Sequence, residues 1–182
     1  MSFPANITFI TGNPAKAEQL GQHLRLPVTH QKLDLPEIQS LDLNEVVAHK
    51  VMEAAKHVTG PVLVEDTSLI FHALGRLPGP LIKWFLTELD NDGLAKLLDG
   101  YDNRQATATV LFGYYDGFSL ETFEGTMNGK VALAPRGERG FGWDPIFIPE
   151  GHNKTWGEMT VEEQKATSMR RLALEKLEAA LR

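Results

Sequence analysis

The chain has 182 residues, 42% of them hydrophobic, which suits one domain or two small lobes with a substantial core. Its formal net charge of -6 argues against a protein that binds duplex nucleic acid, because phosphate contacts normally require a basic face. The chain contains no cysteine, which excludes disulfides, a thiol nucleophile and cysteine-ligated zinc. We find neither a signal peptide nor a run of roughly 20 apolar residues, and therefore expect a cytoplasmic protein without membrane contact.

The first third of the chain alternates predicted strands and helices. A β-branched run predicts a strand at 7–11, a helix follows from about 14 to 24, and a second strand is expected at about 28–35. The next helix begins near Asp42, whose spacing to Glu45 fits a capping box. Its apolar stripe is formed by Leu43, Val46, Val47, Val51, Ala54, Ala55 and Val58.

A third apolar run begins at Gly60 and leads directly into two adjacent carboxylates, Glu65 and Asp66, where we expect the strand to end. The order of strand, helix, strand, helix, strand favours an α/β sheet with helices packed on its faces.

The remainder of the chain is predicted to be partly antiparallel. Residues 81–98 indicate two short helices broken near 90–93. Two long β runs, at 106–115 and 118–125, are joined by the strong hairpin signal at 116–117.

The last predicted helix begins at Thr160, whose spacing to Glu163 again fits a capping box. One face of this helix is expected to carry Ala166, Met169, Leu172, Ala173, Leu177 and Ala180. No linker separates independent domains, so residues 1–182 are expected to form a single domain.

The loop after the first strand, Thr11-Gly12-Asn13-Pro14-Ala15-Lys16, is a candidate phosphate site. A turn between a strand and a helix presents backbone N–H groups at the positive end of the helix dipole, and Lys16 adds a charge. The motif is neither a P-loop nor a dinucleotide fingerprint. An ordinary turn with a solvated lysine explains the local pattern equally well.

Glu65 and Asp66 form a candidate metal site with Glu37, which follows the second strand. Acids at the ends of neighbouring strands converge on one side of an α/β sheet, and hard oxygen ligands suit magnesium. The local pattern alone favours another interpretation, in which the acids cap the next turn and Asp66 or Thr67 binds backbone N–H groups.

Two lysines and one aromatic motif complete the candidates. Lys50 and Lys83 lie among apolar residues, where an isolated lysine most often extends its ammonium past the core to solvent. The motif at 139–145, RGFGWDP, could stack on a base and accept hydrogen bonds from it, although aromatic side chains near a turn more often cover the core.

Together these segments resemble the inosine triphosphate pyrophosphatase family, the house-cleaning pyrophosphatases of non-standard purine nucleoside triphosphates, and especially its eukaryotic-type branch. The similarity runs along nearly the whole chain. It is carried by TGNPAK at 11–16, LDLPEIQ at 33–39, PVLVEDTSLIFHALGRLPGPLIKWFL at 61–86, APRG at 134–137, FGWDP at 141–145 and SMR at 168–170.

The resemblance implies a long twisted mixed sheet with flanking helices, in two lobes around a central cleft. It implies magnesium-dependent hydrolysis of inosine, deoxyinosine or xanthosine triphosphate to the monophosphate and pyrophosphate, and a homodimer. Its implied metal ligands are Glu37 and Asp66, and its implied catalytic residues are Asp66, Glu65 and Lys16. Its implied substrate-binding residues are Thr11, Gly12, Asn13, Lys16, Lys50, Thr67, Lys83, Phe141, Gly142, Trp143, Asp144, Lys165, Ser168 and Arg170.

The chain departs from the family pattern near its C-terminus. Gln164 stands where the family usually has lysine, and Met169 replaces the histidine of a Ser-His-Arg triplet. Lys165 could supply the missing charge, whereas Met169 also fits the apolar stripe of the last helix. These changes leave two alternatives open: a nucleotide-binding sensor that has lost turnover, and the same hydrolysis with a different base preference.

Overall fold

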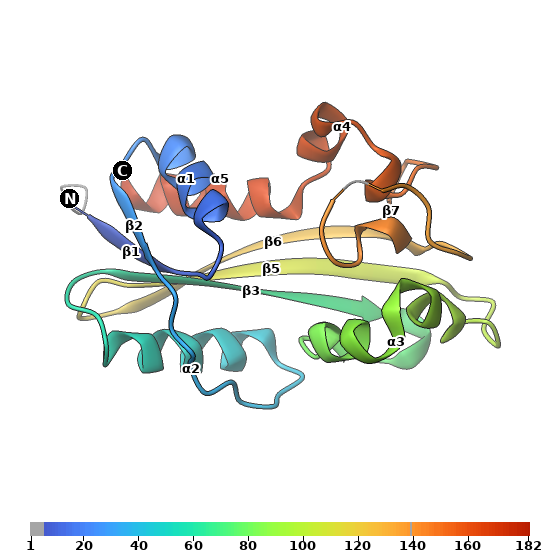
Figure 1. Ribbon diagram of the computed structural model, residues 1–182, viewed down its shortest axis with the longest axis horizontal. Helices are drawn as coiled ribbons and strands as arrows, with labels where there is room; N and C mark the ends of the chain where they lie inside the picture. The colour runs from blue at the N-terminus through green and yellow to red at the C-terminus, as the bar shows by residue number, and fades with distance from the viewer. Residues whose placement is uncertain (1–5, 139) are drawn as a thin grey trace. The chain divides into compact units, whose positions relative to one another are not determined.

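This computed structural model describes residues 6–138 and 140–182 (Figure 1). Residues 1–5, which belong to the N-terminal segment without a signal-peptide pattern, and Arg139 of the aromatic motif lie outside the described residues. The chain forms two compact units. Unit 1 comprises the chain up to Asp66 together with Val110–Gly125 and Arg170–Arg182, and unit 2 comprises Thr67–Thr109 and Thr126–Met169.

One mixed sheet runs through the described residues in the order β2-β1-β3-β5-β6-β7, with β4 paired to β3. Its strands are β1 Ile7–Ile10, β2 Val28–Gln31, β3 Val62–Phe71, β4 Pro78–Gly79, β5 Gln105–Tyr115, β6 Leu120–Val131 and β7 Phe147–Pro149. β1 pairs in parallel with β2 and β3, whereas β4 and β7 pair antiparallel with their neighbours. The predicted mixed α/β sheet is therefore confirmed.

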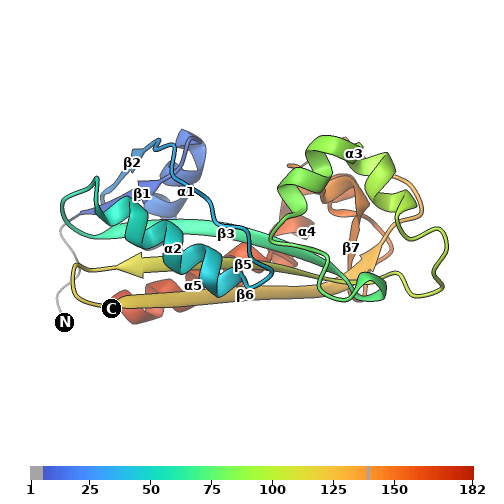
Figure 2. The same ribbon diagram turned by 90° about the horizontal axis from the view of Figure 1, so that it is seen from below.

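The helices of unit 1 are α1 Pro14–Leu24, α2 Leu43–Ala55 and most of α5 Met169–Leu181. α1 and α5 lie on one face of the strands and α2 lies on the other (Figures 1 and 2). The predicted stripe of α2 is confirmed for its five buried residues, Leu43, Val46, Val47, Val51 and Ala54, whereas Ala55 is half-buried and Val58 lies beyond the end of the helix. All of the buried five but Val46 join a core with β1, β3 and β5. This core contains Ile10, Leu43, Val47, Val51, Ala54, Val62, Val64 and Leu111.

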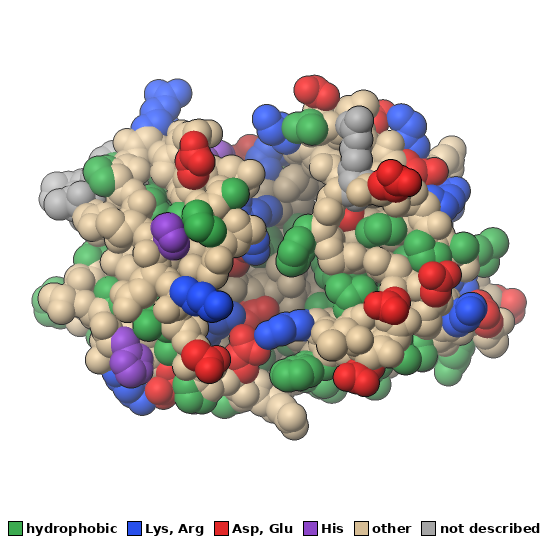
Figure 3. Space-filling view, viewed as in Figure 1, with side chains coloured by type: hydrophobic (Ala, Val, Ile, Leu, Met, Phe, Trp, Pro, Cys, Tyr) green, Lys and Arg blue, Asp and Glu red, His purple; other side chains and the backbone are tan. Residues whose placement is uncertain are grey.

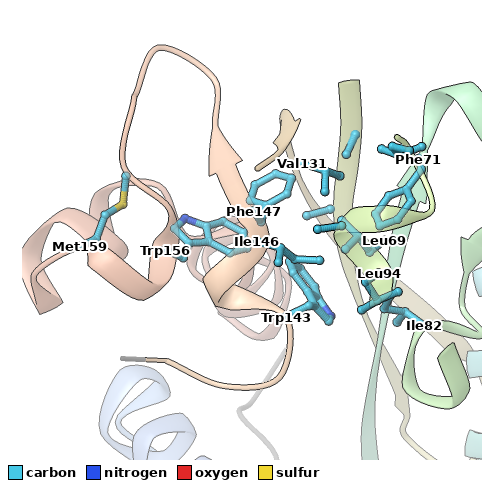
Figure 4. Close-up of a cluster of buried hydrophobic side chains, with 14 residues drawn as sticks. Leu69, Phe71, Ile82, Leu94, Val131, Trp143, Ile146, Phe147, Trp156 and Met159 are labelled. Atoms are coloured by element: carbon cyan, nitrogen blue, oxygen red, sulfur yellow. The ribbon is translucent and has the colours of Figure 1, made fainter. Parts of the chain in front are cut away.

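Unit 2 contains α3 Ile82–Lys96, α4 Val161–Ala166 and the short 3-10 turns η1 His72–Leu74, η2 Asp144–Ile146 and η3 Trp156–Glu158. The predicted break in α3 is confirmed at Asp90, which has φ 53° and ψ -177°. Figure 4 shows the aromatic centre of this core, which is formed by Trp143, Phe147 and Trp156. The ring centroid of Trp156 lies 5.6 Å from that of Trp143 and 4.5 Å from that of Phe147, and the last two are 5.8 Å apart. Among the described residues, no helix combines the length and apolar character needed to cross a membrane.

The β3 prediction was wrong at its end. The strand continues through Glu65 and Asp66 to Phe71, so the two acids do not cap a turn. β2 also differs, because it stops at Gln31 and not near residue 35. Among the described residues its one ladder partner is β1, whose register ends with Ile10 opposite Gln31, and the last backbone bond between the two segments runs from Thr11 N–H to the Gln31 carbonyl at 3.0 Å.

The helix signals were only partly correct. Asp42 is the N-cap of α2 as predicted, but its side chain accepts from Asn44 N–H while Glu45 accepts from Ser40 Oγ, so the capping box is absent. The capping box of Thr160 and Glu163 is confirmed.

The last helix is not continuous. It breaks at Thr167, whose hydroxyl contacts the Glu163 carbonyl and accepts a hydrogen bond from Trp156 Nε1. The break turns the apolar stripe, so that Ala166 and Ala180 are exposed while Leu174 and Leu181 are buried.

Candidate functional site

The candidate site in unit 1 lies where β3 extends past the end of β1. β1 pairs with β3 only through Thr8 opposite Val62 and Phe9 opposite Leu63, so β3 has no β1 partner at Glu65 and Asp66. The chain leaves β1 at this point and turns into α1. Ligands of open α/β sheets bind at such carboxyl ends, especially where neighbouring crossovers lie on opposite faces.

The loop into α1 is organised by its own side chains. Thr11 Oγ1 accepts from Asn13 N–H at 3.1 Å, and Asn13 Oδ1 caps α1 by accepting from Ala15 N–H at 3.0 Å. Gly12 has no positive φ, and a Cβ added there would lie nearest to the Lys32 side chain. The N-terminus of α1 is thus partly capped internally, and Lys16 stands in its first turn.

Glu65 and Asp66 point to opposite faces of β3, as successive residues of a strand must. Glu65 interacts with Lys16 of α1 and, at 2.8 Å, with Arg170 Nε of α5. Asp66 Oδ2 instead accepts from Lys50 Nζ of α2 at 3.1 Å. The sequence suggested a pair of acids, but the fold separates them into two charge clusters.

Glu65 is a buried anion, with 7% of its side chain exposed. Burial raises the pKa of its carboxyl, but the charges of Arg170 and Lys16 outweigh burial and hold that pKa below the ordinary value. Glu65 therefore remains ionised and paired at neutral pH.

Lys50 lies between the two predicted metal ligands. Its Nζ is 3.1 Å from Asp66 Oδ2 and 3.5 Å from Glu37 Oε1. Burial lowers the pKa of Lys50, but the two carboxylates outweigh it, so the net pKa is raised. The sequence pattern favoured a Lys50 side chain that extends to solvent. In the structure, the Lys50 ammonium instead bridges Glu37 and Asp66.

The remaining cation and hydroxyl predicted to bind phosphate lie in unit 2. Thr67 follows Asp66 directly in β3. Lys83 is exposed in the first turn of α3, with its Nζ 5.5 Å from the centroid of the Trp84 ring.

The aromatic motif of unit 2 separates into one exposed and one buried ring. Phe141 is 79% exposed, whereas Trp143 is 8% exposed and packs edge-on against Phe147 in the core. Trp143 therefore anchors the loop at 140–144 to the core of unit 2. Phe141 is the ring that can offer its face to a ligand.

Asp144 fixes the backbone of this motif by accepting a hydrogen bond from Phe141 N–H at 2.6 Å. Gly140 has φ +94°, and a Cβ there would overlap the Asp144 carboxylate. Burial raises the pKa of Asp144 to about 6, although the bond from Phe141 lowers it. The carboxylate of Asp144 is thus held in a poorly hydrated position.

Asn91 also holds this loop and was missed by the sequence analysis. The break at Asp90 places Asn91 so that its Nδ2 donates to the carbonyl of Gly142 at 2.9 Å. Asn91 Oδ1 is buried and has no hydrogen-bond partner among the described residues. No sequence motif marks Asn91; only the broken-helix signal at 90–93 pointed to this region.

Asn91→Ala is expected to loosen residues 140–142, because it removes one side-chain hydrogen bond and leaves a loop carbonyl without its donor. The expected loss of unfolding free energy is about 1 kcal/mol. Hydrogen exchange followed by mass spectrometry should show faster exchange in the peptide containing Phe141. The neighbouring exposed variant Asp92→Ala is the control, and equal exchange in both variants would contradict this role.

The C-terminal residues that depart from the family pattern have structural partners. Gln164 Nε2 donates to the carbonyl of Trp156 at 2.6 Å, and Met169 packs against the core of unit 2. Lys165 is exposed, and Ser168 immediately precedes α5. The interpretation of Met169 as a residue that packs on the core is therefore confirmed.

Arg170 has a second neighbour that the sequence did not reveal. Its guanidinium lies 5.4 Å from the centroid of the Phe112 ring, which belongs to β5. Its Nη2 is buried without a hydrogen-bond partner in the described part of the chain. On the face shown in Figure 3, basic and acidic side chains are interspersed.

Three comparisons relate the chain to known proteins. The model of the Ham1 family matches residues 7–180. The chain is 44% identical to "Inosine triphosphate pyrophosphatase" of Schizosaccharomyces pombe, over 97% of this chain and 95% of that protein. It is 45% identical to "Inosine triphosphate pyrophosphatase 2" of Trypanosoma cruzi, over 95% and 90%. A HAM1 protein structure from Coxiella burnetii matches with a TM-score of 0.85 and 26% identity, over 97% and 98%.

Proposed function

Because the chain belongs to the Ham1 family, we propose that it hydrolyses non-standard purine nucleoside triphosphates to the nucleoside monophosphate and pyrophosphate. The observation that carries the proposal is the similarity over nearly the full length to two proteins named inosine triphosphate pyrophosphatase. Inosine, deoxyinosine and xanthosine triphosphates are the proposed substrates. The charge clusters around Glu65 and Asp66 support this chemistry, because they gather cations and acids where β3 extends past the carboxyl end of β1.

Magnesium is the proposed cofactor, and the donors of unit 1 fit it. Glu37 and Asp66 both reach the same ammonium group of Lys50, so their oxygens can face one cation. Among the described residues no group of three or more His, Cys, Asp or Glu forms a metal cluster. Two carboxylates suit an ion that usually keeps waters and shares substrate phosphates. When bound, magnesium offsets the negative charge of the reacting phosphates.

Residues of unit 1, and two residues of unit 2, have distinct proposed roles in the reaction. Asp66 accepts a proton from the attacking water, whose oxygen forms a bond to the α-phosphorus. The bond between the α-phosphorus and the oxygen that bridges it to the β-phosphorus breaks, and pyrophosphate leaves. Lys16 and Lys50 provide positive charge for the triphosphate, the kind of electrostatic stabilisation that dominates phosphoryl transfer. Phe141 is proposed to stack on the base and Asp144 to accept a hydrogen bond from it.

The substrate panel tests this proposal. Pyrophosphate release is measured from inosine, xanthosine, guanosine, adenosine and deoxyuridine triphosphates, with magnesium and with a chelator. We expect magnesium-dependent turnover of the first two substrates, at least about tenfold faster than of adenosine triphosphate, since a site that binds oxo groups disfavours amino bases. Equal turnover of all five would refute the base preference, and tight binding without turnover would favour a sensor.

A homodimer and a cytoplasmic location also belong to the proposal. The family resemblance implies the dimer, and the sequence pattern, without a recognisable signal peptide or long apolar run, is the ground for the location. Light scattering coupled to size-exclusion chromatography tests the dimer, and a monomer at micromolar concentration would contradict it.

A further inference from the structure

Glu65 occupies an unusual position for an acid beside a catalytic carboxylate. Only 7% of its side chain is exposed, and its neighbour Asp66 faces the opposite side of β3. A buried carboxylate is costly unless it is paired and hydrogen-bonded. The partners of Glu65 therefore show what its carboxylate does.

Both oxygens of Glu65 are engaged by cations from distant parts of the chain. Oε1 accepts from Lys16 Nζ in the first turn of α1, and Oε2 accepts from Arg170 Nε at 2.8 Å in the first turn of α5. The Phe112 ring flanks the guanidinium of Arg170, with its centroid 5.4 Å from Cζ. We call these four residues the Glu65 cluster.

One hydrogen-bond donor of the Glu65 cluster has no acceptor in the part of the chain that the structure describes. Arg170 Nη2 is buried and has no hydrogen-bond partner among the described residues, although the same guanidinium is held by Glu65 and Phe112. Because buried donors are normally satisfied, this N–H group marks a place for an acceptor. Glu65 fixes the orientation in which that donor is offered.

The same contacts argue against two other roles for Glu65. Two cations, Lys16 and Arg170, already engage both Glu65 oxygens and offset its charge, which disfavours a further metal cation there, whereas Glu37 and Asp66 share the single ammonium of Lys50. A base must accept a proton from water beside Asp66, but Glu65 faces α1 and α5 while Asp66 faces α2.

We propose that Glu65 is a positioning residue, which holds Lys16 and Arg170 in one fixed arrangement so that both present donors to the same nucleoside triphosphate. This inference rests on the proposed function. It differs from the role implied by the family resemblance, because Glu65 acts through two other side chains and contacts neither the metal nor the attacking water.

A positioning role and a purely electrostatic role of Glu65 predict changes in KM of opposite sign. If Glu65 contributed only negative charge, its removal would make the site more positive and would lower KM for a triphosphate. If Glu65 positions the cations, Glu65→Gln should raise KM by about tenfold, since a misoriented charged hydrogen bond is lost. Glu65→Asp keeps the charge but withdraws the oxygens by one methylene, and should raise KM as well.

The magnesium dependence separates positioning from metal binding. Steady-state kinetics with inosine triphosphate are measured for wild type, Glu65→Gln, Glu65→Asp and Glu37→Gln at varied magnesium. We expect the half-saturating magnesium concentration to stay within about twofold in both Glu65 variants and to rise severalfold in Glu37→Gln. Glu175→Gln, an exposed acid on α5, is the matched control and should leave kcat and KM unchanged.

Three results would overturn the inference: a lower KM in Glu65→Gln, an unchanged KM in Glu65→Asp, or a magnesium shift equal to that of Glu37→Gln. If Glu65→Gln does not fold, Phe112→Leu removes the ring that lies beside the Arg170 guanidinium and should raise KM with unaltered magnesium dependence; an unchanged KM would overturn the inference. Absence of turnover in wild type would refute the proposed function instead. Calorimetric binding of inosine triphosphate would then compare the same variants, with weaker binding expected in both Glu65 variants and unchanged binding contradicting the inference.

Discussion

Asp66→Asn is expected to lower kcat for inosine triphosphate by about 10³-fold while the protein remains folded. The amide has the same shape but cannot take a proton from water and offers only a neutral oxygen to magnesium. Lys50 retains its second acid, Glu37, at 3.5 Å, so the cluster is not left with an unpaired ammonium. Single-turnover kinetics and circular dichroism give the two measurements.

The control for this prediction is Asp102→Asn, which makes the same chemical change at an exposed aspartate. It should leave kcat unaltered. Near-normal turnover in Asp66→Asn would show that another group activates the water, and would remove Asp66 from the catalytic role.

Asp144→Asn is expected to stabilise the protein at pH 8 and to lose that effect in acid. Burial raises the folded-state pKa of Asp144 from 3.8 to about 6, so its ionised form is less favourable in the folded than in the unfolded chain. The difference corresponds to about 3 kcal/mol of unfolding free energy above pH 6, and it disappears as pH falls through 6 toward about 4. The introduced amide still offers an oxygen to Phe141 N–H.

Urea denaturation of wild type and Asp144→Asn between pH 4 and pH 8 measures this difference. The exposed variant Asp92→Asn is the control and should change the unfolding free energy by less than about 0.5 kcal/mol at any pH. A stabilisation that does not vary with pH, or a loss of stability at pH 8, would contradict the account. A carboxylate that costs stability at neutral pH is the kind of group that proteins retain for function.

Local signals in the sequence were sufficient where neighbours along the chain determine the structure. The helix at 14–24 matches α1 because Asn13 and Pro14 supply an N-cap and a first-turn proline. The hairpin at 116–117 holds because Gly117 adopts φ +104° and Asp116 Oδ1 accepts from two backbone N–H groups. The break within α3 followed from its cluster of turn-forming residues.

The sequence could not predict features that depend on distant partners. β2 ends early because β1 ends, and the last helix breaks where Thr167 meets Trp156. Both effects come from tertiary contacts that override local propensity. The same holds for Asn91, whose hydrogen bond to the Gly142 carbonyl spans 51 positions of the chain.

At the candidate site, the sequence identified the residues but did not predict how they are arranged. The motifs named Lys16, Glu65, Asp66 and Arg170, but they suggested that Glu65 and Asp66 act as a pair. Because β3 continues through both acids, strand alternation sends them to opposite faces. The partner of Glu65 on α5 lies 105 positions along the chain, a separation at which spacing carries no information.

Hydrolysis of inosine triphosphate in ¹⁸O-labelled water tests the central proposal most directly. Mass spectrometry of the products locates the atom that water contributes. We predict one label in inosine monophosphate and none in pyrophosphate, because water attacks the α-phosphorus and pyrophosphate leaves unaltered. Label in pyrophosphate or in orthophosphate would place the attack at another phosphorus and contradict the proposed reaction.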